Sequence, residues 1–89
     1  MSESARDQAR ALPENPGCYL MKDASDVVIY VGKAKNLKRR VNSYFLPNRN
    51  AKTAALVEKI VTIDYVITGN EYEALVLENN LIKKYNPHY

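Results

Sequence analysis

The stretch GCYLMKDASDVVIYV, residues 17–31, predicts a β-hairpin. Two runs rich in apolar, β-branched and aromatic residues flank the polar loop DASD (23–26), which is the pattern of two short strands joined by a tight turn. A four-residue loop sets a register in which Tyr19 lies directly opposite Tyr30, with Cβ atoms about 4.5–5.5 Å apart. Two facing phenols fit either an aromatic core contact or a functional site. The predicted strands are residues 17–22 and 27–31.

Start and stop signals on both sides of the hairpin predict four helices and a third strand. Asn36, Asn50 and Asn70 each precede an amphipathic stretch and are expected to cap it, and Glu73 has the spacing of a capping box with Asn70. The alternating segment TIDYVIT (62–68) is predicted to be a strand. The predicted helices are residues 3–11, residues 36–45, a segment opened by Asn50 that carries Leu56, Val57 and Ile60, and residues 70–85.

These elements predict one α/β domain over residues 1–89, with a small, mostly antiparallel three-stranded sheet flanked by helices. A chain of 89 residues with 46% hydrophobic and 26% charged residues is typical of a single globular domain. No apolar run approaches the roughly 18 residues of a membrane span, and the N-terminus lacks the apolar segment of a signal peptide. With one cysteine, neither an intrachain disulfide nor a cysteine-rich zinc site is expected. We therefore expect a cytoplasmic monomer that makes no membrane contact.

The charges are segregated along the chain. Between Asp26 and Glu58 the sequence has seven cations and no acid, although the net charge of the whole chain is only +3. Such segregation gives a small protein one positive face, which favours contact with a nucleic-acid backbone. An ordinary solvated helix face that happens to be basic is the alternative. The seven cations are Lys33, Lys35, Lys38, Arg39, Arg40, Arg49 and Lys52.

Glu78 lies in the middle of the apolar face of the last predicted helix. At about 100° per residue it falls between Ala74 and Ile82 and beside Tyr85. A carboxylate removed from water is costly unless it is paired, hydrogen-bonded or bound to metal. Two interpretations follow: a ligand for a hard metal that faces a polyanion, or a structural acid paired with an arginine or with tyrosine hydroxyls. The apolar positions of this face are Ala74, Leu77, Leu81, Ile82 and Tyr85.

The residues after the second strand add two cations to the tyrosine pair. Tyr30 is followed at once by Val31-Gly32-Lys33, so a phenol, a turn and a cation are expected together at the end of the strand. On the next helix, Arg40 is expected at the edge of the apolar stripe, where it can lean over the sheet, and Arg39 on the opposite, solvated side. Gly32-Lys33 is not a Walker phosphate loop, because the upstream glycine and the following Ser or Thr are missing.

The tripeptides Gly17-Cys18-Tyr19 and Tyr30-Val31-Gly32 resemble the paired motifs of the GIY-YIG nuclease family. Two longer stretches, GKAKNLKRRVNSYF (32–45) and NEYEALVLENNLIKKYNPHY (70–89), are similar more narrowly to the UvrC branch of that family, which acts in bacterial nucleotide excision repair. Isoleucines of the family pattern are replaced by Cys18 and Val31, which are expected to face away from the tyrosines. The pattern also has an asparagine just beyond Tyr89, so the 89 residues are expected to be a domain excised from a longer chain.

The resemblance implies a metal-dependent endonuclease that hydrolyses a DNA phosphodiester on the 3′ side of a lesion, delivered by a UvrB–DNA complex. It implies Glu78 as the ligand of a single Mg²⁺ or Mn²⁺ ion and Tyr30 as general base. A phenol with a pKa near 10 would need a depression of about 3 pKa units, roughly 4 kcal/mol, to act at pH 7, and the metal and neighbouring cations are expected to supply it. The other implied site residues are Tyr19 (positioning), Arg40 and Lys33 (phosphate charge) and the helix-end Tyr44, with Lys35, Lys38, Arg39, Arg49 and Lys52 as DNA-binding residues.

Three other functions fit the same residues. The chain can be a stand-alone small nuclease of the same family, or a non-catalytic nucleic-acid-binding module that uses the basic face alone. It can also be a docking domain for a protein partner in which Glu78 and Arg40 form a structural salt bridge.

Overall fold

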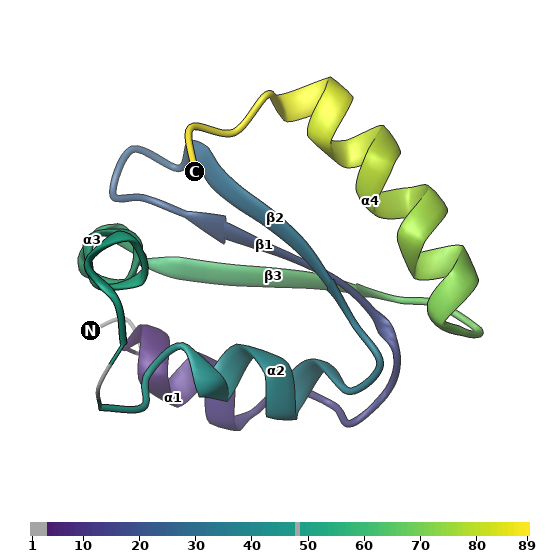
Figure 1. The fold of residues 1–89 in the computed structure, drawn as a ribbon, viewed down its shortest axis with the longest axis horizontal. Helices are drawn as coiled ribbons and strands as arrows, with labels where there is room; N and C mark the ends of the chain where they lie inside the picture. The colour runs from purple at the N-terminus through teal and green to yellow at the C-terminus, as the bar shows by residue number, and fades with distance from the viewer. Residues whose placement is uncertain (1–3, 48) are drawn as a thin grey trace.

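The computed structural model describes residues 4–47 and 49–89, and it confirms the predicted α/β class (Figure 1). The predicted helix start at residue 3 lies outside the described residues. In the part that is described, no helix is long and apolar enough to cross a membrane. The helices are α1 (Ala5–Arg10), α2 (Leu37–Ser43), α3 (Ala51–Lys59) and α4 (Glu71–Tyr85), and the strands are β1 (Gly17–Lys22), β2 (Val28–Ala34) and β3 (Thr62–Ile67).

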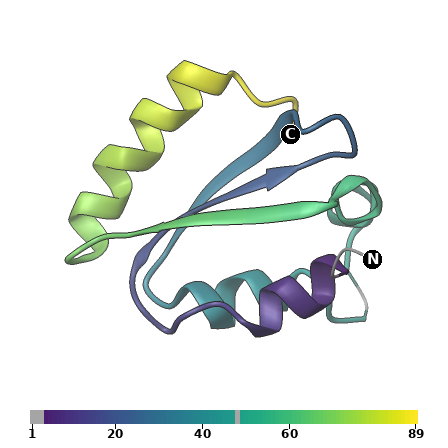
Figure 2. The ribbon, with the colours of Figure 1, turned by 180° about the vertical axis from the view of Figure 1, so that it is seen from behind.

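The sheet separates two layers of helices. β1 is the central strand and pairs antiparallel with both neighbours, in the order β2-β1-β3. α1 and α2 cover one face and α4 crosses the other, and the view from behind shows the same arrangement (Figures 1 and 2). Because side chains alternate along a strand, Tyr19 and Met21 face α1 and α2, whereas Cys18 and Leu20 face α4.

The larger of two apolar cores lies between the sheet and helices α1, α2 and α3. It contains Tyr19 and Met21 from β1, and the predicted stripes of α2 and α3 supply Leu37, Val41 and Leu56. A smaller core under α4 is formed by Leu20, Val28 and Val31, with Leu81 packed against it. Since the larger core contains residues of β1, β2 and α2, it fixes the position of α2 relative to the two strands.

The hairpin register differs from the prediction. Tyr19 lies opposite Gly32, and Tyr30 lies opposite Met21, because the connecting loop is one residue longer than expected and Ile29 forms a β-bulge that shifts the pairing by one more residue. The loop that joins the strands holds five residues, 23–27, rather than four. Its geometry is set by Asp23, whose carboxylate accepts hydrogen bonds from the N–H groups of residues 25 and 27. Tyr19 and Tyr30 are therefore diagonal neighbours on one face, still within reach of each other.

Gly32 lies inside a strand and not in a turn. β2 continues to Ala34, so Lys33 also belongs to the strand. The ring of Tyr19 packs directly over Gly32, and a Cβ at position 32 would fall on the ring carbon Cζ and the oxygen of Tyr19. The missing side chain of Gly32 is thus the space that the Tyr19 ring occupies, which is the close approach for which strand glycines are used.

Helix caps follow the prediction closely. The side chains of Asn36, Asn50 and Asn70 each accept a hydrogen bond from the backbone N–H three residues later. The capping box of α4 is shifted by one residue, because the carboxylate of Glu73 accepts from the N–H of Gly69, at 2.8 Å, instead of that of Asn70. α4 thus begins at a fixed point directly after the sheet, which sets the position of Glu78 along its axis.

Candidate active site

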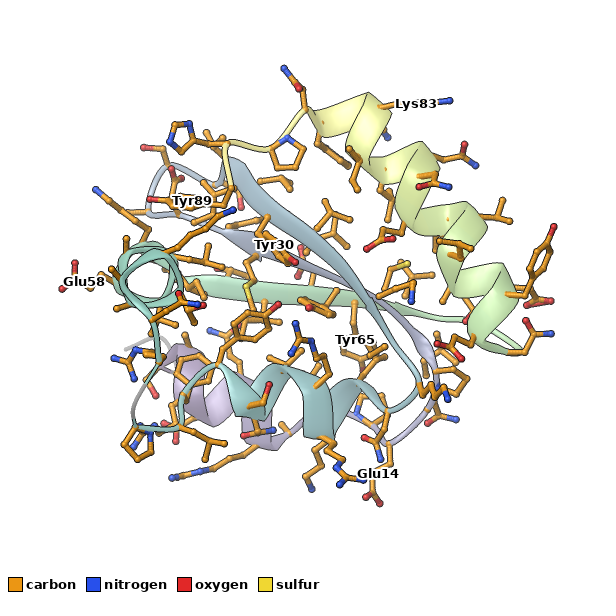
Figure 3. All side chains as sticks on the ribbon, in the orientation of Figure 1. Glu14, Tyr30, Glu58, Tyr65, Lys83 and Tyr89 are labelled. Carbon is orange, nitrogen blue, oxygen red and sulfur yellow. The ribbon has the colours of Figure 1, made fainter. Side chains whose placement is uncertain are left out.

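Three tyrosines from different elements meet on the face of the sheet that α2 covers. Tyr19 comes from β1, Tyr30 from β2 (labelled in Figure 3) and Tyr44 from the C-cap of α2. Their ring centroids are 6.0 Å apart for Tyr19–Tyr30, 6.0 Å for Tyr19–Tyr44 and 6.1 Å for Tyr30–Tyr44. Every pair lies within the range of edge-to-face and tilted aromatic contacts. The sequence placed these residues in one site, and the structure brings them together.

The tyrosine hydroxyls are hydrogen-bonded to one another and to Arg40. The Oη atoms of Tyr19 and Tyr44 are 2.7 Å apart, and Nη2 of Arg40 donates to Oη of Tyr44 at 3.2 Å. The guanidinium also lies over the Tyr44 ring, 4.8 Å from its centroid, which is a cation–π contact. Arg40 therefore leans over the sheet as predicted, because α2 ends with Tyr44 directly beneath it.

All three phenols hold their protons more tightly than usual. Burial raises the pKa of Tyr19 to about 12, although Tyr44 and Arg40 partly oppose it. Burial also raises the pKa of Tyr30 to about 12, with Tyr44 adding to the effect and Arg40 lowering it. The pKa of Tyr44 rises to about 12, first through burial and then through Tyr19. For each phenol, the cost of removing the phenolate from water thus outweighs its attraction to the Arg40 guanidinium.

The residues around Tyr30 raise its pKa instead of lowering it, which differs from the expectation. The cation predicted to help lower this pKa, Lys33, is three residues further along β2 and therefore lies on the opposite face of the sheet. Arg40 does lower the pKa, but burial acts more strongly in the other direction. At neutral pH Tyr30 is consequently a neutral phenol whose hydroxyl can donate as well as accept a hydrogen bond.

Lys33 and Glu78 form a second group on the face that α4 covers. Cys18 pairs with Lys33 in the β1–β2 ladder, and its thiol donates to the carbonyl of Ala74 at 3.0 Å. Burial raises the pKa of Cys18 to about 11; the charge of Glu78 adds to this rise, and that of Lys33 opposes it. Both charged groups therefore lie close to the thiol. β2 contributes one residue to each group: Tyr30 to the tyrosine cluster on one face of the sheet, and Lys33 to this second group on the other face.

Glu78 faces the sheet as predicted but is only half-buried. The inward face of α4 consists of fully buried Ala74 with half-buried Leu77, Glu78 and Leu81, whereas the predicted members Ile82 and Tyr85 are 40% and 41% exposed. The buried stripe of α4 is narrower than the periodicity indicated. The strand beneath this side of the helix, β2, is the edge of the sheet, and no further strand lies beyond it to cover Ile82 and Tyr85. Among the ion pairs of residues 4–47 and 49–89, none involves Glu78, so the alternative of a structural salt bridge with Arg40 is wrong.

The donor set of this second group fits one hard cation. Within the described ranges, no three His, Cys, Asp or Glu side chains gather into a metal cluster, and Glu78 is the carboxylate that this second group contributes. Mg²⁺ commonly binds through one or two carboxylates and keeps several of its waters.

Three of the predicted DNA-binding cations, Lys35, Arg39 and Lys52, line two pockets that share Arg40. A pocket of about 450 Å³ is lined by three further cations, Lys33, Lys35 and Arg39. A smaller pocket of about 170 Å³ is lined by Tyr30, Tyr44 and the cation Lys52. Arg39 is exposed as expected, but it shares the first pocket with Arg40 and does not point to the opposite side. Lys38 and Arg49 are exposed residues outside both linings.

Sequence reasoning missed two residues of the site. Glu71, the first residue of α4, forms ion pairs with Lys33 at 3.7 Å and with Lys35 at 3.6 Å. Tyr89 lines the smaller pocket beside Tyr30 (both labelled in Figure 3), and its N–H donates to the carbonyl of Ile29 at 3.0 Å. Both contacts join segments far apart in sequence, and helical periodicity carries no signal for them.

The hairpin with its two tripeptides, the tyrosine–arginine cluster and the carboxylate of the last helix together define a GIY-YIG domain. The chain belongs to the family of UvrC-like GIY-YIG domains, whose model matches residues 15–89. It is 57% identical over 83 residues to the UvrABC system protein C of Aster yellows witches'-broom phytoplasma, and 59% identical over 85 residues to that of Symbiobacterium thermophilum. These alignments cover 93% of the chain and 14% of each relative.

Solved structures confirm the predicted fold. The GIY-YIG N-terminal endonuclease domain of UvrC from Thermotoga maritima, bound to its catalytic divalent cation magnesium, is 42% identical in sequence with a TM-score of 0.88, and the match covers 100% of this chain and 98% of that chain. Matching structures of that domain also include variants with single tyrosines changed to phenylalanine, each bound to the catalytic cation. The Thermotoga maritima domain thus holds the kind of ion, a single divalent cation, that the sequence of this chain predicted.

Proposed function

We propose that this domain is a divalent-metal-dependent DNA endonuclease that cuts a phosphodiester on the 3′ side of a lesion during nucleotide excision repair. The observation that carries the proposal is the arrangement at β2, where a phenol cluster with a guanidinium lies on one face and a lysine with a half-buried carboxylate lies on the other. The solved domain that this chain matches along its whole length is an endonuclease bound to a catalytic cation.

Glu78 is the residue that would hold the ion, as Mg²⁺ or Mn²⁺. When bound, such an ion supplies Lewis-acid polarisation of the phosphate and stabilises the leaving oxygen. Lys33 lies on the same face of the sheet and offers a positive charge to a non-bridging phosphate oxygen.

Arg40 and the tyrosines act from the other face. The guanidinium of Arg40 is held by Tyr44 through a hydrogen bond at 3.2 Å and a ring contact, so it can present its remaining N–H groups to the charge that develops in the transition state. The hydroxyl of Tyr30 is proposed to orient the attacking water and to accept its proton. With a pKa of about 12, only ~10⁻⁵ of the molecules carry the Tyr30 phenolate at pH 7. A divalent cation held by Glu78 would lower this pKa, so that Tyr30 would first release its own proton to solvent and then accept the proton of the water.

Tyr19 has a positioning role. Its ring is 1% exposed and its hydroxyl bonds to Tyr44; it therefore touches the groups that line the site without lying open to a substrate. It fixes the hydroxyl of Tyr44, which in turn fixes Arg40.

The partner and the context of the cut belong to a longer protein. The chain spans about one seventh of the UvrABC system protein C sequences that it matches. We propose that a UvrB–DNA complex presents the damaged strand to this domain inside the bacterial cytoplasm. The basic pockets on either side of Arg40 support contact with DNA and are compatible with such a presentation.

A metal-binding measurement tests the site independently of turnover. Titration of the chain with Mn²⁺, followed by electron paramagnetic resonance, is expected to show one site per chain that Glu78→Gln removes. Glu58→Gln is the matched control, because Glu58 is exposed on α3 at the far end of the sheet (Figure 3). Retention of the Mn²⁺ site in Glu78→Gln would overturn the ligand assignment.

Nicking of duplex DNA tests the reaction. Tyr30→Phe is expected to keep the fold and DNA affinity but to lose at least a hundredfold in cutting rate, which is the usual contribution of a positioned proton acceptor. The control is Tyr72→Phe, since Tyr72 is 72% exposed. Undiminished cutting by Tyr30→Phe would remove Tyr30 from the proton-accepting role.

A further inference from the structure

The larger basic pocket contains one acid among its cations. Lys33, Lys35, Arg39 and Arg40 line a pocket of about 450 Å³, and Glu71 is the only acid of that lining within residues 4–47 and 49–89. The carboxylate of Glu71 faces two of these cations at once, with Oε1 at 3.7 Å from Lys33 and Oε2 at 3.6 Å from Lys35. Each carboxylate oxygen thus faces a different ammonium group.

Two non-bridging oxygens of a phosphate can face the Lys33 and Lys35 ammonium groups in the same way as the two oxygens of the Glu71 carboxylate do. A phosphate and a carboxylate both present paired anionic oxygens to basic groups, and lysine binds either as a point charge. Because the pocket shares Arg40 with the smaller pocket that Tyr30 and Tyr44 line, a phosphate held here would lie beside the candidate active site.

The ion pairs of Glu71 are weak enough to be exchanged. Both distances are longer than the 2.7–2.9 Å or so of a tight charge-assisted hydrogen bond. The side chains are also accessible, at 45% for Glu71 and 79% for Lys35, and pairs as exposed as these contribute little to stability.

We propose that Glu71 occupies a phosphate subsite of this domain in the absence of DNA and leaves it when DNA binds. The inference rests on the proposed function, because it takes the ligand to be DNA. Glu71 then acts as an internal competitor. It lowers the affinity for any DNA, and it keeps Lys33 and Lys35 oriented toward the pocket until a phosphate replaces the carboxylate.

The test compares two variants that change the charge equally within one helical turn. Glu71→Gln removes the competing charge, whereas Glu73→Gln removes a charge whose carboxylate bonds to the N–H of Gly69, and glutamine can keep that bond. Binding of the 89-residue chain to a fluorescein-labelled 20-base-pair duplex is measured by anisotropy in EDTA, so that no cutting occurs. Glu71→Gln is expected to lower the Kd by about three- to tenfold at 50 mM salt, the range expected for two exposed ion pairs.

Two further measurements separate competition from a structural role. The gain from Glu71→Gln should shrink at 300 mM salt, because screening weakens exposed charges, and it should fall by at least half in a Lys35→Gln background. In a nicking assay Glu71→Gln should lower KM. A thermal melt of each variant shows whether the charge change at the start of α4 alters stability.

The failures of the two proposals are distinguishable. If Glu71→Gln binds the duplex no better than Glu73→Gln, or binds it more weakly, the phosphate-subsite inference is overturned even when the chain cuts DNA. If Glu71→Gln shows the expected gain but the wild-type chain never nicks DNA in Mg²⁺ or Mn²⁺, the inference stands and the endonuclease proposal fails.

Discussion

Gly32→Ala tests whether packing of Tyr19 over β2 determines the geometry of the site. A Cβ at position 32 would fall on the Cζ and Oη atoms of Tyr19 and lie 2.8 Å from its Cε2. Ordinary carbon–carbon contact requires about 3.5 Å, so the ring must retreat by roughly 1 Å. Gly32 has no positive φ, so any cost comes from this collision and not from backbone strain.

The magnitude follows from three contributions. Overpacking in a well-packed core costs about 1–3 kcal/mol, and loss of the buried Tyr19–Tyr44 hydrogen bond, 2.7 Å long, adds about 1 kcal/mol. Replacement of a strand glycine by alanine gives back about 0.5–1 kcal/mol of backbone entropy. The net destabilisation is therefore about 2 kcal/mol, or roughly 10 °C in Tm for a domain of this size. DNA cutting should fall more steeply than stability, because Tyr44 and Arg40 lose their support.

Urea denaturation in two backgrounds isolates the collision. Tyr19→Leu removes the three atoms that collide with the new Cβ, so Gly32→Ala in that background should cost nothing or stabilise slightly. Gly69→Ala is the control, because its Cβ would meet the flexible carboxylate of Glu73 at 2.9 Å. An equal cost of Gly32→Ala in the wild-type and Tyr19→Leu backgrounds would refute the reasoning.

Three further predictions concern pH, capping and salt. The pKa of Tyr19 is about 12 in the folded protein against 10.0 for a free phenol, so this phenol contributes up to about 3 kcal/mol of stability that is complete below pH 10 and is lost as the pH rises through 12. Urea midpoints between pH 9 and 12 should fall less steeply for Tyr19→Phe than for wild type, and parallel curves would contradict the pKa assignment. Asn70→Ala removes the cap of α4 and should lower the free energy of unfolding by about 1 kcal/mol. Because α4 carries Glu78, Asn70→Ala should weaken Mn²⁺ binding more than Asn50→Ala does, and equal effects of the two variants on Mn²⁺ affinity would contradict this expectation. Since five of the seven predicted cations line the two pockets, log K for duplex DNA should fall against log[salt] with a slope of about −4.5, whereas a slope near −1 would exclude the basic pockets as the DNA contact.

The sequence determined the elements and the inward face of each helix. Asparagine caps, apolar periodicity and β-branched runs are local signals, and they placed α2, α3, β3 and α4 within two residues of their observed bounds. Local periodicity also showed that Arg40 would lean over the sheet and that Glu78 would face it. The resemblance to known nuclease domains then joined these residues into one site.

Tertiary structure decided the contacts between those elements. The five-residue loop and the bulge at Ile29 together moved Tyr30 from its expected place opposite Tyr19 to one opposite Met21, because pairing depends on turn geometry and not on strand propensity. Burial raised the pKa of Tyr30 instead of lowering it, since desolvation depends on the residues packed around the phenol. The ion pairs of Glu71 with Lys33 and Lys35 join residues more than 35 positions apart. Local sequence patterns specify only which way each side chain faces, and the distances that set charge and hydrogen bonding appear when β2, α2 and α4 pack around one sheet.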